Sequence, residues 1–284
     1  MSSYFRIFIF FVVISLQSSS AFVAEASFDH SRFQKILKEY VNEKGEVDFK
    51  GLKKESHLLN EYLYAYEQLD IKDLTYNWVR EERLAALLNF YHALLLKVIV
   101  DAYPIRTVND LPNFWNAQRI YIGAKKLGGF FSLTQLQNEE LMGKFHDEKL
   151  RTAMWLGARG GPRLRNQVFD ALKVEGQLFL AAKEFVNNDQ LNYIQPGERK
   201  IYISSIFKWH AGEFTLDFGD VDDERDLTNK EYAVLSFISY YLDNEDKISY
   251  LEDGRYKIRY QKFDWSLPEW NREKELSSAQ PASS

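Results

Sequence analysis

One long apolar segment, residues 81–102, constrains the fold of this 284-residue chain more than any other feature. Apolar residues recur along it at helical spacing, and further apolar residues occupy the opposite side. The first set comprises Leu84, Leu87, Leu88, Tyr91, Leu95, Val98 and Ile99, and the second Ala85, Ala86, Leu94, Leu96 and Val100. A helix that is apolar all round must be enclosed by other elements. The sequence therefore predicts a buried central helix that ends before Pro104.

The rest of the chain predicts shorter helices joined by turns and hairpins. Apolar spacing and capping boxes at Ser132 and Thr228 indicate helices over residues 28–41, 58–69, 132–145, 165–186 and 228–241. In 165–186 we expect Phe169, Leu172, Leu178, Phe179, Ala182 and Phe185 to be buried. Residues 150–156 fit either a buried strand or a helical segment. Turn residues indicate hairpins over 119–131, 193–203 and 248–260. The predicted fold is α+β, a mainly helical single domain over residues 27–270 with short β-hairpins or a small antiparallel sheet.

The first residues have the pattern of a secretory signal. Arg6 precedes an apolar run from Ile7 to Leu16, and small residues follow. We expect a signal peptide over residues 1–26, cut after Ala24-Glu25-Ala26 or, alternatively, after Ser19-Ser20-Ala21. The run is too short for a helix that spans a bilayer, although a membrane-tethering helix is the other interpretation. The sequence thus predicts an exported protein, periplasmic or secreted, without an integral membrane segment after cleavage. Residues 271–284 are polar and predict a disordered tail.

The composition of the chain excludes several kinds of partner and of chemistry. The net charge of -5 argues against nucleic acid as a partner. The chain has no cysteine, so it has no disulfide, no thiol nucleophile and no thiolate zinc site. Aromatic residues make up 15% of the chain. We interpret them first as core, and alternatively as a surface that binds carbohydrate or a partner.

The stretch MWLGARGGPRLR, residues 154–165, is the strongest candidate for a binding site. Its Gly-Gly-Pro sequence forces a turn, and three arginines surround that turn. Backbone N–H groups at the start of a following helix would favour an anion, and guanidinium groups would add bidentate contacts. The candidate ligand-binding residues are Arg159, Gly160, Gly161, Arg163 and Arg165. The alternative is a solvated rim of arginines around a structural turn.

Asn89 and His92 are the polar residues that stand out within the central helix. They lie three residues apart on one face, and buried polar groups need partners. His92 is a candidate base or ligand, or else a core residue with its hydrogen bonds satisfied. His210 is a third catalytic candidate, the only evident base near Ser204-Ser205. The histidine spacing predicts no metal site, and no cofactor is expected. If these residues act together, Asn89, His92, residues 157–165 and Trp209-His210 should converge on one pocket.

Several motifs together resemble DUF547, a family of uncharacterised function. They occur in the family's order across residues 45–268. They are Asn89-Phe90-Tyr91, Tyr103-Pro104, Phe114-Trp115, Ser132-Leu133, Gly160-x-Pro162-x-Leu164-Arg165, Ile203 to Trp209, and Phe263 to Leu267.

The chain departs from the family pattern at the positions that carry reactive groups. The resemblance places two family cysteines on Leu156 and Gly161, and a histidine on Arg151. At further positions this chain has a different residue from the one usual in the family. The family's Glu-His pair is replaced by Gln137 and Asn138, its serine by Ala158, its proline by Arg163, its asparagine by His92, and its Trp-Tyr by Trp209-His210. A thiol mechanism is therefore impossible here, and the resemblance implies a divergent, non-catalytic member, a pseudoenzyme.

The sequence thus predicts an exported DUF547-like protein with a binding or structural role. Its expected partner is a small anionic ligand or a glycan; no protein partner is identified. The alternative is a hydrolase-like enzyme that uses His92, Asn89 and His210 without a thiol. A third interpretation is a polysaccharide-associated surface protein that uses exposed aromatic residues.

Overall fold

A computed structural model describes residues 28–69, 77–117, 120–122, 129–219, 227–272 and 275. The predicted signal over residues 1–26 and almost all of the predicted tail lie outside these residues, as does part of the first predicted hairpin.

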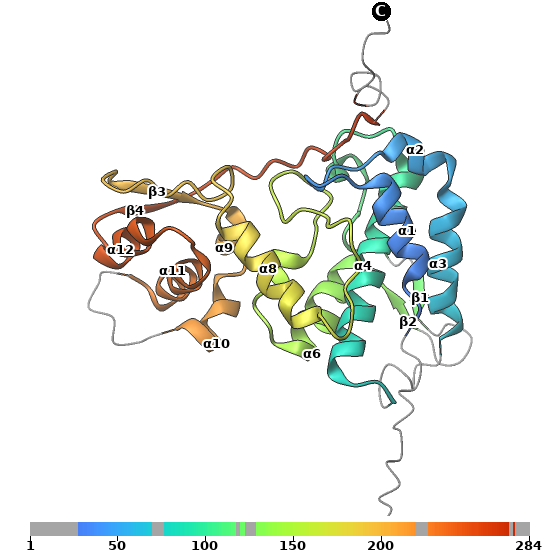
Figure 1. Cartoon of the computed structure of the whole chain (residues 1–284), viewed down its shortest axis with the longest axis horizontal. Helices are drawn as coiled ribbons and strands as arrows, with labels where there is room; N and C mark the ends of the chain where they lie inside the picture. The colour runs from blue at the N-terminus through green and yellow to red at the C-terminus, as the bar shows by residue number, and fades with distance from the viewer. Residues whose placement is uncertain are drawn as a thin grey trace, which may run out of the picture.

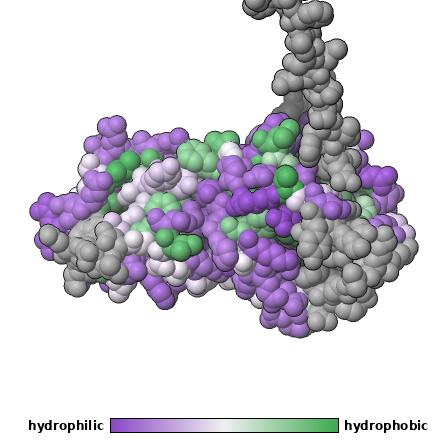
Figure 2. All heavy atoms as spheres, turned by 90° about the horizontal axis from the view of Figure 1, so that it is seen from below, coloured by the Kyte–Doolittle hydropathy of each residue, from purple (hydrophilic) through white to green (hydrophobic). Residues whose placement is uncertain are grey.

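The central helix, α4 (Arg80–Ala102), lies in the interior as predicted. It packs against α2 (Phe49–Lys54), α3 (Ser56–Gln68) and α8 (Val174–Val186). Among the described residues, α4 is the single helix with the length and hydropathy of a membrane span, and 89% of that apolar window is buried inside the molecule. On the face shown in Figure 2, hydrophilic residues dominate and apolar residues form separate patches. The apolar surface of α4 is therefore covered by the protein itself.

The elements up to α7 surround α4 and form what we call the N-terminal lobe. Besides α2, α3 and α4, it contains α1 (Ser31–Tyr40), η2 (Val108–Asp110), β1 (Ile120–Ile122), β2 (Gly129–Phe131), α5 (Leu133–Gln135), the π-helix η3 (Leu136–Met142), α6 (Gly143–Phe145) and α7 (Leu150–Ala153). β1 and β2 pair antiparallel, with Ile120 opposite Phe131, so this hairpin is confirmed. The Ser132 capping box is also confirmed at the start of α5.

The remaining elements form the C-terminal lobe. They are β3 (Lys200–Ile203), α9 (Ser205–Trp209), η4 (Ala211–Phe214), α10 (Thr215–Phe218), α11 (Asn229–Tyr241), α12 (Glu245–Asp253) and β4 (Lys257–Tyr260). Helix α8 joins the lobes (Figure 1). Val174 and Leu178 belong to the hydrophobic core of the N-terminal lobe, whereas Ala182 and Phe185 belong to that of the C-terminal lobe.

The mainly helical class is confirmed, but the hairpin predicted over 248–260 is wrong. Residues 245–253 form α12, because the Asn244 side chain accepts a hydrogen bond from Lys247 N–H and caps the helix. Asp253-Gly254 is then a helix end, where Gly254 takes the left-handed conformation with φ of 68°. β4 follows and pairs parallel with β3, with Lys200 opposite Lys257, so this sheet is not antiparallel. Of the hairpin over 193–203, one antiparallel bridge between Tyr193 and Tyr202 is present.

The helix predicted over 165–186 begins only at Val174, and two of its residues are not buried. Leu172 is 96% exposed and Phe179 is 43% exposed. Local hydrogen bonds explain the late start. The Asp170 side chain accepts from Leu172 N–H, while the Gln177 side chain bonds Asp170 N–H and Val168 C=O. These bonds satisfy the backbone in a non-helical conformation.

Residues 261–270, which we call the crossing segment, connect the two lobes. In Figure 1 this red segment runs from β4 across to the N-terminal lobe. Gln261 N–H donates to Ile203 C=O at 2.8 Å in the C-terminal lobe. Leu267 N–H donates to Arg106 C=O at 3.0 Å, and Trp270 N–H to Val47 C=O at 2.9 Å, in the N-terminal lobe. The crossing segment is therefore bonded to both lobes and connects them a second time, besides α8.

Candidate functional site

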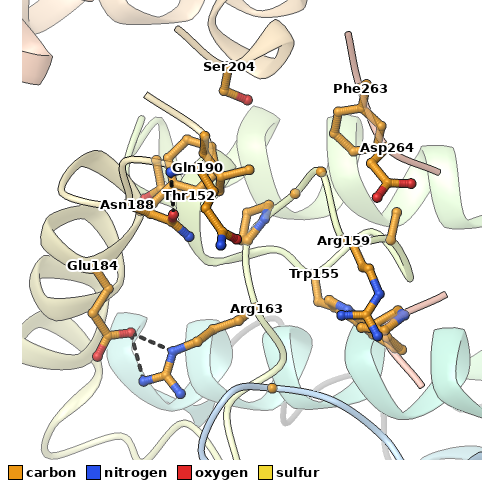
Figure 3. Close-up of a pocket in the computed structure, with 18 of the residues that line it drawn as sticks. Thr152, Trp155, Arg159, Arg163, Glu184, Asn188, Gln190, Ser204, Phe263 and Asp264 are labelled. Atoms are coloured by element: carbon orange, nitrogen blue, oxygen red, sulfur yellow. Dashed lines mark hydrogen bonds and ion pairs between the residues drawn. The ribbon is translucent and has the colours of Figure 1, made fainter. Parts of the chain in front are cut away.

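A pocket of about 700 Å³ lies where the two lobes meet. The Gly160-Gly161-Pro162 turn forms one wall. The other walls come from the C-terminal half of α8, the start of α9 and the crossing segment. Figure 3 shows Glu184 and Arg163 on one side of the pocket, with Asp264 and Arg159 on the other. The turn singled out in the sequence is thus part of a cavity between lobes, a common location for ligand sites.

Backbone contacts fix the turn against the crossing segment. Gly160 N–H donates to Asp264 C=O at 2.8 Å, and Arg159 N–H donates to Ser266 C=O at 3.0 Å. A Cβ atom at Gly160 would lie 2.6 Å from Asp264 N, closer than any real side chain allows. Glycine is needed at this position because two backbone segments approach each other directly.

Each arginine of the turn has an acidic partner. Arg159 pairs with Glu46 at 2.9 Å, while Arg163 and Arg165 share Glu184 at 2.9 and 3.0 Å. Figure 3 shows the Arg163–Glu184 contact. Burial lowers the pKa of Arg165, although Glu184 opposes that shift. An anionic ligand would therefore have to compete with these carboxylates.

Two lysines, which the sequence analysis did not select, supply the unpaired positive charge. Lys44 and Lys262 line the pocket, and neither forms an ion pair with any residue that the structure describes. In total the pocket lining carries five cationic side chains (Lys44, Arg159, Arg163, Arg165, Lys262) and three anionic ones (Glu46, Glu184, Asp264). The pocket is therefore net positive in a chain that is net negative. No local sequence signal marks these lysines, because their role depends on distant segments meeting.

Asn89 and His92 do not line the pocket; they fasten α4 to the segments around the turn. The Asn89 side chain donates to Phe169 C=O at 2.8 Å and accepts from Phe169 N–H at 2.9 Å. His92 Nε2 accepts from Trp155 N–H at 3.1 Å, and its ring stacks on Phe169. Burial lowers the pKa of His92 to about 3, so the imidazole is neutral at physiological pH. Both side chains are fully buried in this arrangement.

His210 lies in a different network, so the expected convergence is not observed. Its Nδ1 is 3.1 Å from Glu213 Oε1. Arg151 binds both Glu213 oxygens, at 2.6 and 2.8 Å, and also donates to Asn138 Oδ1 at 2.8 Å. Burial opposes ionisation of Glu213, yet hydrogen bonds from His210 and Arg151 lower its pKa to about 2. Residues 158–163 and Arg165 line the pocket, whereas Trp209 and His210 are absent from its lining.

Some of the positions that depart from the pattern implied by the resemblance are in contact with one another. Asn138 and Arg151, which stand at two of its histidine positions, are hydrogen-bonded. Gln137 donates to the Tyr91 hydroxyl at 2.6 Å, and that hydroxyl donates to Trp155 C=O at 2.7 Å. Three of the substituted positions, Asn138, Arg151 and His210, therefore belong to one polar network around a buried arginine, and Gln137 belongs to a second one around Tyr91. The lone Arg151 in an apolar run was the sequence signal for the first network.

The two positions aligned with the family's cysteines are also adjacent. An ideal Cβ atom at Gly161 would lie 3.6 Å from Leu156 Cβ, within the range of disulfides. We expect the double variant Leu156→Cys/Gly161→Cys to form an intramolecular disulfide under air oxidation and to gain up to about 2 kcal/mol of stability. Thiol titration measures this without background, since the chain has no other cysteine. Each single-cysteine variant is the control, and two persistent thiols in the double variant would contradict the expected geometry.

Away from the pocket, the buried carboxyl group of Glu148 in the N-terminal lobe contacts the exposed Asp217 of α10. Burial raises the pKa of Glu148 to about 7, with a hydrogen bond to Asp217 and the charge of Asp147 adding to the shift. Lys149 opposes it in part. The folded protein therefore prefers Glu148 protonated, whereas in the unfolded chain this carboxyl ionises near the ordinary glutamate pKa of 4.5.

This pair predicts a pH-dependent effect of Glu148→Gln. As pH rises from about 4.5 to 7, wild type loses the stabilisation of the protonated carboxyl. Burial lowers the pKa values of His30 and His92 to about 4 and 3. These two neutral histidines therefore make the protein less stable as the pH falls below 6.5, which is the opposite pH dependence. The variant isolates the Glu148 contribution because both histidines remain. Urea unfolding should show Glu148→Gln gaining about 1–2 kcal/mol relative to wild type between pH 5 and pH 8, since solvent screens part of the effect. A difference independent of pH would refute the raised pKa of Glu148.

The fold and pocket together define a mainly helical, two-lobed protein with a net-positive cavity at the lobe junction. Residues 75–186 match the family model described as "Protein of unknown function, DUF547", which confirms the family assignment over that segment. It covers α4 and the Gly-Gly-Pro turn. No curated protein and no solved structure matches the chain.

Proposed function

We propose that this chain is an exported, non-catalytic protein that binds a small anion, bearing a carboxylate or phosphate, in the pocket between its lobes. The observation that carries the proposal is the pocket's excess of positive charge, with the Lys44 and Lys262 ammonium groups unpaired among the described residues. A cavity of about 700 Å³ has the size of a small-molecule site.

The buried Trp155 indole does not contribute to this binding. Its Nε1–H has no hydrogen-bond partner, but the side chain is 0% exposed, so a ligand in the pocket cannot reach it. Asn89 and His92 have no part in the proposed binding, because their hydrogen bonds go to backbone groups.

The test is thermal shift with citrate, galacturonate and inorganic phosphate at low salt. We expect at least one anion to raise the melting temperature, and the shift to shrink as ionic strength rises. Lys44→Gln/Lys262→Gln should weaken its affinity about tenfold, and Glu184→Gln should strengthen it severalfold, because Arg163 and Arg165 lose their internal competitor. Arginine variants are less informative, since removing either cation also leaves Glu184 more available.

The matched control is Lys35→Gln/Lys38→Gln, which removes the same charge from exposed positions of α1. It should leave the affinity within about twofold of wild type. If no anion binds, or if both lysine pairs behave alike, the proposed function is wrong.

A further inference from the structure

Three tryptophans form a row beside the pocket and across the junction of the lobes. Trp115 comes from the N-terminal lobe, Trp265 from the crossing segment and Trp209 from α9. The ring centroids of Trp209 and Trp265 lie 5.9 Å apart, and the two rings stack with an interplanar angle of 18°. Trp115 contacts Trp265 edge-on, with 6.4 Å between the ring centroids. Phe263, which also lines the pocket, contacts Trp209 at 5.0 Å and Trp265 at 4.4 Å. The aromatic row is thus continuous with the wall of the pocket.

The row remains open to solvent. Trp209 is 46% exposed, and Trp115 and Trp265 are half-buried. Trp265 packs against the cores of both lobes, which accounts for its own position. That structural role does not account for Trp209. Tryptophan has the largest apolar side chain, and nearly half of the Trp209 side chain is exposed to water. An exposed cluster of this kind marks a binding surface more often than a scattered apolar residue does.

We propose that the tryptophan row is a sugar-binding platform that extends the anion pocket, so that the ligand is an acidic oligosaccharide. The C–H groups on one face of a pyranose ring pack against the electron-rich face of an indole. Successive rings along an acidic glycan would place one sugar on Trp209 and direct a neighbouring carboxylate to the cationic pocket beyond Phe263. The net-positive lining selects an acidic glycan over a neutral one. This inference rests on the proposed function, because it assumes that the pocket binds the carboxylate of the glycan.

The experiment compares galacturonate with tetragalacturonate by titration calorimetry, using the whole chain. We expect the tetramer to bind at least tenfold more tightly than the monomer. Trp209→Ala should weaken tetramer binding about tenfold and leave monomer binding unchanged, since the monomer occupies the pocket alone. Trp209→Phe should retain part of the tetramer affinity. Tyr202→Ala, which removes an exposed aromatic ring outside the row, should alter neither ligand. Urea unfolding confirms that each variant is folded.

The outcomes separate the two proposals. Tetramer binding that Trp209→Ala leaves intact would overturn the platform while the anion pocket stands. Equal binding of monomer and tetramer would also overturn it. If citrate and phosphate bind through Lys44 and Lys262 but neither sugar does, the pocket stands and the glycan assignment fails. Equal affinity for neutral cellotetraose and tetragalacturonate would overturn the acidic assignment, and loss of all anion binding would refute the proposed function itself.

Discussion

Asn89→Ala is expected to lower the free energy of unfolding by about 3–4 kcal/mol. The substitution removes both partners of the Phe169 backbone, leaving a buried N–H and a buried C=O without hydrogen bonds. Each orphaned group costs about 1–3 kcal/mol. Urea or thermal unfolding measures the loss. His92→Ala should be destabilising for a related reason, because Trp155 N–H loses its acceptor and the ring stack on Phe169 disappears.

The control for Asn89 is Asn166→Ala. The Asn166 side chain donates to Glu43 at an exposed site, where water replaces the lost bond. It should change stability by no more than about 0.5 kcal/mol. The hydrolase-like interpretation makes the opposite prediction for His92: loss of a turnover with the stability unchanged. A stable His92→Ala protein would therefore argue against our structural assignment.

Gly160→Ala is expected to destabilise the protein by about 3 kcal/mol and to abolish anion binding in the pocket. The added methyl group would meet Asp264 N at 2.6 Å and Asp264 O at 3.1 Å, both of them backbone atoms. The crossing segment would have to move away, which breaks the Gly160–Asp264 and Arg159–Ser266 hydrogen bonds. Unfolding and calorimetry on the same preparation measure both effects.

The neighbouring glycine supplies a matched control. A Cβ atom at Gly161 would lie 3.5 Å from Phe263 and 3.6 Å from Leu156, which are ordinary contacts. Gly161→Ala should therefore cost less than about 1 kcal/mol. If Gly160→Ala and Gly161→Ala prove equally mild, the close approach between turn and crossing segment is wrong.

The sequence predicted the elements whose determinants are local. The apolar periodicity of α4 and the capping boxes at Ser132 and Thr228 each operate within a few residues, and the structure confirms all three. The predictions that proved wrong rested on sequence patterns that fit two different structures. Asp253-Gly254 fits a hairpin turn and a helix end equally well, and the Asn244 cap decides between them. In the helix predicted over 165–186, the bonds of Asp170 and Gln177 outweighed the helical spacing of apolar residues.

The site could be predicted only in part, because its residues bond to partners that are far away in the sequence. The sequence indicated that Asn89 and His92 need partners, but those partners lie 80 and 63 positions away. The arginines of the turn were visible as a cluster, whereas Glu46 and Glu184, which pair with them, come from separate segments. Lys44 and Lys262 were missed for the same reason. Spacing reveals neighbours along an element; it does not reveal which distant elements meet.

The position of residues 261–270 has a consequence for biosynthesis. They are translated after both lobes, yet Gly160, Arg106 and Val47 all bond to them. A nascent chain that ends before residue 261 keeps α8 as the connection between the lobes, but it lacks Leu267 and Phe263, a core residue of each lobe. Final assembly of the binding cavity must therefore wait until the ribosome has released residues 261–270, and a chain cut short in this stretch would lack one wall of the site.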